Sequence, residues 1–156
     1  MKIQFKTTLV ASLLLCSVHA LANDAAKIAL VKKTIASGDI GTYASPSLKQ
    51  LSNKAYKLQF QIGDSDLGCD YFDNYFLGLG QDDANITNMK VTVLSNGLTR
   101  ATFLNYGSKE TVDFNISCQG KTCQINDVIS YYEGKADPLT YKKYAEYIIN
   151  RRQCPQ

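Results

Sequence analysis

The spacing of apolar residues changes from helical to strand-like near the middle of the chain. Up to Gly80, apolar residues recur every three or four positions, as on one face of a helix. From Asn88 onward they alternate with polar residues, as in half-buried strands. The pattern predicts an α+β domain in which N-terminal helices pack on an antiparallel sheet.

Three helices are expected in the first half of the chain. The first has Asp24 as its cap and ends at Gly38, and the second begins at Ser45-Pro46, a hydroxyl cap followed by a first-turn proline, and runs to about Gly63. The third is the aromatic stretch between Cys69 and Gly80, capped by Asp70 or its neighbour. In that stretch we expect Phe72, Phe76 and Leu79 to point inward and the tyrosines, Tyr75 above all, to lie at the boundary of the core.

Four strands are predicted after the helices. The first two meet at the hairpin signal Asn96-Gly97, and the third places Val112, Phe114, Ile116 and Cys118 on one face. The fourth begins at Cys123 and completes a curved four-stranded antiparallel meander. Asp137-Pro138 then signals an extra C-terminal helix that reaches about Arg152.

The first twenty-two residues have the pattern of a secretory signal peptide. Lys2 and Lys6 precede an apolar run from Leu9 to Val18, and Ala20-Leu21-Ala22 is a small-residue cleavage site. The apolar run is too short for a stable membrane span, so no membrane anchor is expected after cleavage. Residues 1–22 are thus predicted to be a leader, and residues 23–156 are predicted to form a single α+β domain. The mature protein is expected to be periplasmic or secreted.

Removal of the leader leaves four cysteines, for which three pairings are possible. Cys118 and Cys123 flank a four-residue segment, Gln119 to Thr122, and a hairpin there would place them opposite one another at bridging distance. We therefore pair Cys118 with Cys123, which leaves Cys69 with Cys154. The second bridge closes the longer loop and is expected to stabilise the fold more.

Two other uses of the cysteines fit the sequence less well. A lipoprotein would be cleaved before Cys16, but Leu15 is not the small residue that such cleavage needs. A zinc site normally takes close-spaced cysteine pairs or histidines, whereas the chain after the leader has no CxxC motif and no histidine, since His19 lies in the leader. Structural disulfides in an oxidising compartment are the better interpretation.

Charge and composition exclude several classes of function. Lys2 and Lys6 belong to the leader, so cleavage lowers the formal charge from +3 to about +1, which does not favour nucleic acid as a partner. Without histidine or a free thiol after leader removal, a Ser-His-Asp or Cys-His arrangement is impossible. An acidic-aromatic pair of Asp70 with a tyrosine is the remaining candidate for isomerase-like chemistry. We predict no catalytic residue, no cofactor and no metal site.

Three segments resemble a known family. Tyr43–Leu48, Asp70–Asp82 and Gln124–Ile129 are similar to an uncharacterised bacterial exported and lipoprotein family with a nuclear transport factor 2-like cone, over roughly Ala25 to Gly134. Gln124 stands where that family has a tryptophan, and the C-terminal helix is extra. The resemblance implies a bent sheet wrapped around helices, with an open end that can hold a small molecule or meet a partner.

These observations lead to a functional hypothesis and a set of candidate binding residues. We expect a non-catalytic binding protein of the periplasm. The first possibility is an inhibitor or immunity-type protein whose partner is an envelope-directed toxin or enzyme. The second is a carrier or sensor that binds a small ligand inside the cone. An isomerase-like enzyme is the third choice. The candidate contact surface is the acidic and aromatic segment Asp64 to Asp83, with Asp70, Tyr71, Asp73, Tyr75 and Asp82 as binding residues.

Overall fold

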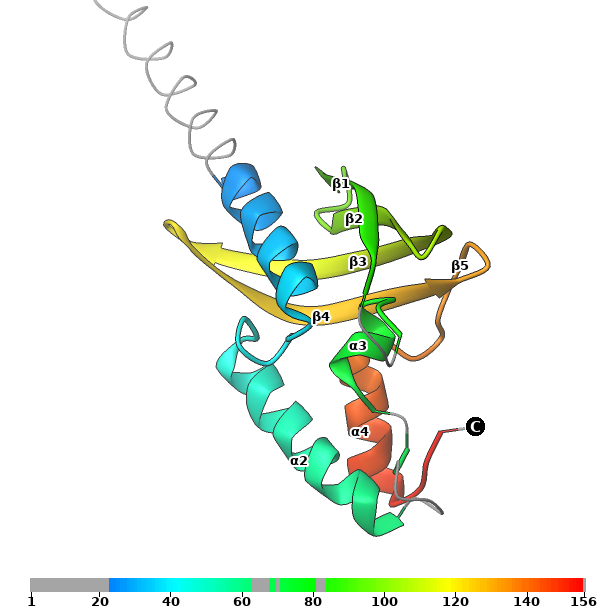
Figure 1. The fold of residues 1–156 in the computed structure, drawn as a ribbon. Coiled ribbons are helices and arrows are strands. Elements are labelled where there is room, and N and C mark those ends of the chain that lie inside the picture. The colour runs from blue at the N-terminus through cyan, green and yellow to red at the C-terminus, as the bar shows by residue number, and fades with distance from the viewer. Residues whose placement is uncertain (1–22, 63–67, 70, 81–83, 156) are drawn as a thin grey trace, which may run out of the picture.

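The computed structural model describes residues 23–62, 68–69, 71–80 and 84–155, in which an antiparallel sheet is crossed by the N-terminal helix and the other helices lie at one end (Figure 1). The predicted leader, residues 1–22, lies outside the described residues, so cleavage stays a prediction. After an N-terminal helix described over residues 23–37, the elements are α2 (Pro46–Ile62), α3 (Asp73–Phe76), β1 (Ile86–Val93), β2 (Thr99–Asn105), β3 (Ser108–Gln119), β4 (Thr122–Tyr132), β5 (Lys135–Ala136) and α4 (Tyr141–Arg151).

The N-terminal helix lies across β3 and β4 in Figure 1, where it is drawn in blue. Val31 and Ile35 on its inner face are fully buried and belong to the same core as Phe114 of β3. Its end was predicted correctly, because the Gly38 N–H donates to the Thr34 carbonyl at 3.0 Å with φ at 65°. Its start was not, since Asp24 is itself helical rather than a cap.

Helix α2 begins at the predicted cap and proline. Ser45 precedes it, with its Oγ 3.5 Å from the Leu48 N–H, and Pro46 is the first helical residue. The buried side of α2 packs against α4 and contains two polar residues among its apolar ones: Leu48, Ser52, Ala55, Leu58 and Gln59.

The sheet has five strands rather than the four predicted, in the order β1-β2-β3-β4-β5, each antiparallel to the next. The additional strand, β5, has two residues and pairs with Tyr131 and Tyr132, so it is too short to give a periodic pattern in the sequence. Beside β4, the Ser45 N–H donates to the Ile125 carbonyl at 2.8 Å, which joins the start of α2 to the sheet.

Both predicted disulfides are present. Cys118 and Cys123 are direct partners across β3 and β4, and Cys69 is bonded to Cys154 over a separation of 85 residues. The hairpin is tighter than expected, because Gln119 pairs with Thr122 and only two residues remain in the turn. Gly120 supplies the positive φ, 60°, that this turn needs.

The C-terminal helix begins later than the sequence suggested. Its N-cap is Thr140, which accepts from the Lys143 N–H, and not Asp137. Asp137 instead forms a local turn, with its carboxylate accepting from the Leu139 N–H at 2.8 Å. Asp127 of β4 fixes the start of α4 by accepting from the Thr140 hydroxyl at 2.7 Å, so the sheet determines where α4 begins.

Candidate functional site

An open cleft of about 380 Å³ lies where the end of the N-terminal helix, α2 and α3 meet. Three of its lining residues are aromatic and most of the others are polar; they are Gly38, Asp39, Gly41, Ser52, Asn53, Tyr56, Phe72, Asp73, Asn74 and Tyr141. Segments from four separate parts of the chain, including Tyr141 at the start of α4, therefore contribute to one concave surface.

Asp73, one of the predicted binding residues, joins those segments. Its Oδ2 accepts from the Ile40 N–H at 2.7 Å and from the Gly41 N–H at 3.3 Å. Its Oδ1 accepts from the Tyr141 hydroxyl at 2.8 Å. Both carboxylate oxygens thus have donors within the protein, and Asp73 holds the turn after the N-terminal helix against α3 and α4.

Tyr141 forms a buried part of the cleft wall. The residue is 3% exposed, and burial, followed by the nearby charge of Asp73, raises the pKa of its hydroxyl. The hydroxyl therefore stays protonated and donates to Asp73. Its ring stacks on Tyr71 at 4.9 Å between ring centroids, so the wall is continuous with the core.

Three aromatic side chains form the aromatic rim of the cleft: Tyr56 and Phe60 of α2 and Phe72 before α3. Tyr56 is 49% exposed, Phe60 is 44% exposed and Phe72 is partly buried. Their ring centroids lie 5.2 Å (Tyr56 to Phe60), 6.4 Å (Tyr56 to Phe72) and 6.5 Å (Phe60 to Phe72) apart. This is a contiguous aromatic surface next to a polar cleft, on the side of α2 that does not face the core.

The sequence interpretation did not find Tyr56 and Phe60. The signal was available, because these two residues are four positions apart and lie outside the buried stripe of α2. Two large aromatic residues together on the outer face of an amphipathic helix are unusual for a surface that only meets water. The sequence prediction placed the contact surface in the acidic and aromatic segment Asp64 to Asp83 instead, because acidic residues are concentrated there.

Tyr71 is a core residue and not the boundary residue predicted from the sequence. It is 1% exposed, and it packs against Phe76 as well as Tyr141. Burial raises the pKa of its hydroxyl, which lies beside Tyr141 without a hydrogen bond of normal geometry among the described residues. The physical reason for its burial is the buried Gln59 side chain, which forms hydrogen bonds with the backbone N–H and carbonyl of Tyr71.

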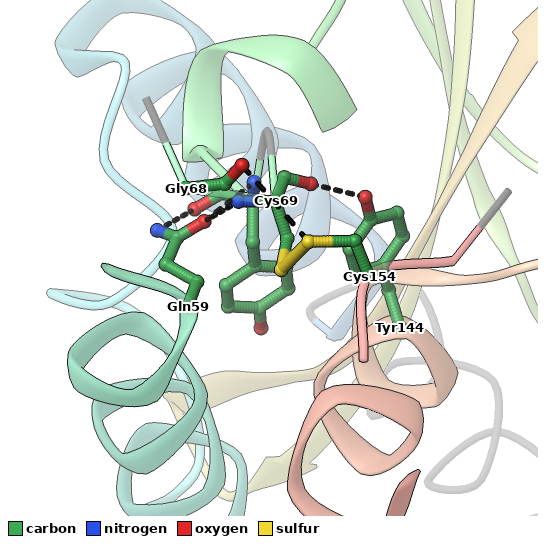
Figure 2. The surroundings of a disulfide bond; sticks show 6 residues. Gln59, Gly68, Cys69, Tyr144 and Cys154 are labelled. Carbon is green, nitrogen blue, oxygen red and sulfur yellow. Dashed lines mark hydrogen bonds between the residues drawn. A yellow bond between two sulfur atoms is a disulfide. The ribbon is translucent and has the colours of Figure 1, made fainter. Parts of the chain in front are cut away.

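Gln59 and the long-range disulfide hold the segment before α3 in place (Figure 2). The Gln59 side chain is fully buried; its Oε1 accepts from the N–H groups of Cys69 and Tyr71 at 3.2 and 2.9 Å, and its Nε2 donates to the Tyr71 carbonyl at 3.0 Å. Tyr144 of α4 donates its hydroxyl to the Cys69 carbonyl, beside the bond from Cys69 to Cys154. Together these contacts place Phe72 and Asp73 at the cleft.

Tyr75, another predicted binding residue, does not line the cleft. Tyr75 is 54% exposed but lines a different, smaller cavity with Gly78 and Glu110. Asp70 and Asp82 lie outside the described residues, as do Asp64 and Asp66, so their predicted roles stay predictions.

Helix α3 is only four residues long, and the sequence misjudged its cap. Phe72 occupies the N-cap position and makes no side-chain hydrogen bond there. Asp73, which could have capped it, directs its carboxylate to Ile40, Gly41 and Tyr141 instead. The inward positions of Phe76 and Leu79 are confirmed by exposures of 0% and 4%, while Phe72 is only partly buried because it contributes to the aromatic rim.

No protein-family model, curated protein or solved structure matches the chain, and the resemblance to the nuclear transport factor 2-like family stays a prediction. Within the described ranges, no helix is long and apolar enough to cross a bilayer. Among the same residues, no group of three or more metal-ligating side chains is arranged to hold an ion.

Proposed function

We propose that this protein is a non-catalytic binding protein of the bacterial periplasm, and that it inhibits an envelope-directed toxin or enzyme in the manner of an immunity protein. The contact surface in this proposal is the cleft with its aromatic rim. The observation that carries it is the aromatic cluster of exposed Tyr56 and Phe60 with half-buried Phe72, beside polar groups that can accept and donate hydrogen bonds. Aromatic anchors next to polar groups are typical of the centres of protein interfaces.

The contacts of Asp73 support binding over catalysis at this site. Both oxygens of Asp73 accept hydrogen bonds from within the protein, which fixes the carboxylate in one orientation between the turn after the N-terminal helix and α4. The Tyr141 hydroxyl is likewise engaged with Asp73 and has a raised pKa. The pair that most resembles an acid-base dyad therefore acts as a rigid support for the cleft.

The two disulfides support an oxidising compartment, and the predicted leader supports export to the periplasm. The bridge between Cys69 and Cys154 also fixes the segment that carries Phe72, which reduces the entropy lost when a partner binds. A preorganised surface of this kind suits a tight inhibitor.

Photocrosslinking tests the proposal directly. A photoreactive phenylalanine analogue placed at position 56 is expected to crosslink a specific protein in a periplasmic extract of the producing cells, whereas the same analogue at Tyr106, an exposed residue in the turn between β2 and β3, is not. The captured protein, once purified, should lose its own activity when the wild-type chain is added.

The double variant Tyr56→Ala and Phe60→Ala then measures the contribution of the aromatic rim. Its affinity for the purified partner should fall by at least about 2 kcal/mol, while Tyr106→Ala binds as the wild type does. Calorimetric titration gives both values. Equal binding by the double variant, or a captured protein whose activity does not change, would contradict the proposal.

The volume of the cleft favours a second candidate, a carrier or sensor of a small ligand. About 380 Å³ lies within the range of known ligand pockets. Native mass spectrometry of the chain purified from periplasm distinguishes the two. A retained small molecule that is lost from the double variant would support the carrier and count against the inhibitor.

A further inference from the structure

A second cavity, of about 110 Å³, lies between β3, β4 and the segment from the end of α3 to Gly78. It is separate from the cleft and from the function proposed above. Its lining residues are Tyr75, Gly78, Glu110, Thr111, Val112, Ser130, Tyr131, Tyr132 and Asp137.

Two polar groups at this cavity, the Ser130 hydroxyl and the Glu110 carboxylate, have no hydrogen-bond partner among the described residues. The Ser130 Oγ is completely buried and has no hydrogen-bond partner among the described residues. Glu110, two residues before the buried Val112 and on the same face of β3, makes no ion pair or hydrogen bond from its carboxylate within that part of the chain. Burial raises the pKa of Glu110, as expected for a carboxylate without a cationic neighbour.

The backbone at Gly78 keeps Glu110 in the cavity. A Cβ at position 78 would lie 3.0 Å from the Glu110 Oε2, so a larger residue there would push the Glu110 side chain aside by a few tenths of an ångström. Gly78 also has a φ of 68°, which side chains other than glycine rarely adopt. The glycine and the glutamate are thus matched in position.

Tyrosines and a second carboxylate complete the surroundings. Tyr132 is 77% exposed and Tyr75 is 54% exposed, so both place aromatic surface at the mouth of the cavity. Asp137 adds negative charge, and one of its oxygens accepts from the Leu139 N–H. Aromatic faces and carboxylates both attract cations, and they attract planar guanidinium groups in particular.

We propose that this cavity binds one guanidinium group, with Glu110 as the carboxylate partner and Tyr132 as an aromatic wall. The size agrees with this occupant. With about 30 Å³ per water molecule, the cavity has room for roughly four small heavy atoms, which is the size of a guanidinium group. The corresponding ligand is an arginine side chain or a small guanidine compound.

The probe for this site is N-acetyl-argininamide, with the citrulline analogue as a neutral control of the same shape. Titration of the leaderless protein, followed by amide NMR, should give saturable shifts centred on Glu110, Val112 and Ser130 with the arginine compound only. Absence of saturable binding, shifts located elsewhere, or an equal response to citrulline would overturn the proposal.

Matched variants assign the binding to the cavity. Glu110→Gln keeps the shape of the side chain and should weaken binding at least tenfold, and Tyr132→Ala, at an exposed position that does not threaten folding, should weaken it several-fold. Glu146→Gln on α4, whose side chain is 44% exposed, removes the same charge at a distance and should bind as the wild type does. Wild-type affinity in Glu110→Gln would refute the proposed guanidinium site. That result would not bear on the function proposed for the cleft with its aromatic rim.

Discussion

The sheet and the helical end are held together by contacts of very different range. Each strand of the sheet pairs with the next one along the chain, so its partners are close in sequence. At the helical end, Tyr141 bonds Asp73 across 68 residues and Cys69 is joined to Cys154 across 85. The sheet is therefore specified by local hairpins, whereas the candidate cleft depends on a few long-range side-chain contacts.

Each region also contains a buried polar side chain that makes three hydrogen bonds. In the sheet, Asp113 is 1% exposed and accepts two hydrogen bonds from Arg100, its cross-strand neighbour, both at 2.7 Å, and one from Tyr131 at 2.9 Å. At the helical end, Gln59 binds backbone groups of Cys69 and Tyr71. The first connects adjacent strands, and the second orders a segment that has no regular structure.

Removing the disulfides one at a time is expected to give the largest difference between the two regions. In the chain-entropy model, the loop closed by Cys69 and Cys154 stabilises the fold by about 4 to 5 kcal/mol, and the short loop of Cys118 and Cys123 by about 2 kcal/mol. The double variant Cys69→Ser with Cys154→Ser should therefore unfold at much lower urea concentration than Cys118→Ser with Cys123→Ser.

Equilibrium urea unfolding of the leaderless protein measures both values. Because each variant removes both members of a pair, neither contains a single free thiol that could form a wrong bridge. Equal losses of unfolding free energy would contradict the distinction between long-range and local contacts.

Gln59→Met is expected to have the next largest effect. Methionine fills similar space but leaves three backbone groups of Cys69 and Tyr71 without partners in a buried site, which should lower the unfolding free energy by about 3 kcal/mol. Tyr144→Phe, which removes the hydrogen bond to the Cys69 carbonyl, should lower the unfolding free energy by about 1 kcal/mol.

Hydrogen exchange locates the effect of Gln59→Met. The backbone amides of Cys69 and Tyr71 should exchange faster than in the wild type. The amides of β2 and β3 should still exchange only through global unfolding of the protein. A uniform loss of protection over both regions would show that the helical end and the sheet unfold as one unit, contrary to the comparison.

The same difference in range explains what the sequence could predict. Alternating residues and turn signals gave the first four strands, and the hairpin at Cys118 and Cys123 followed from spacing alone. The buried position of Tyr71 did not, because it results from Gln59, whose partners no periodic pattern indicates. Likewise, the sequence alone suggests that Asp73 is a loop residue or a helix cap. Its hydrogen bond with Tyr141 exists only because the fold brings these two distant residues together.

Charge on the sheet gives the smallest expected effect, and a pH series detects it. Asp113 is paired with Arg100, whereas Glu110 has no ion pair among the described residues and burial raises its pKa. A carboxyl group with a raised pKa in the folded state binds its proton more tightly there than in the unfolded chain. The unfolding free energy of the protein therefore falls as the pH rises from the unfolded-state pKa, about 4.3, through the raised folded-state pKa. The groups that face Glu110 from neighbouring elements are Asp137, Tyr75 and Tyr132.

Glu110→Gln should remove this pH dependence. We expect the variant to be at least as stable as the wild type at pH 7 and to lose that advantage below pH 4, where Glu110 is protonated in both states. Urea unfolding between pH 4 and 7 measures the difference, with Glu146→Gln as the exposed control. Identical pH profiles for wild type and Glu110→Gln would place Glu110 in an ordinary solvated environment and remove the contrast with Asp113.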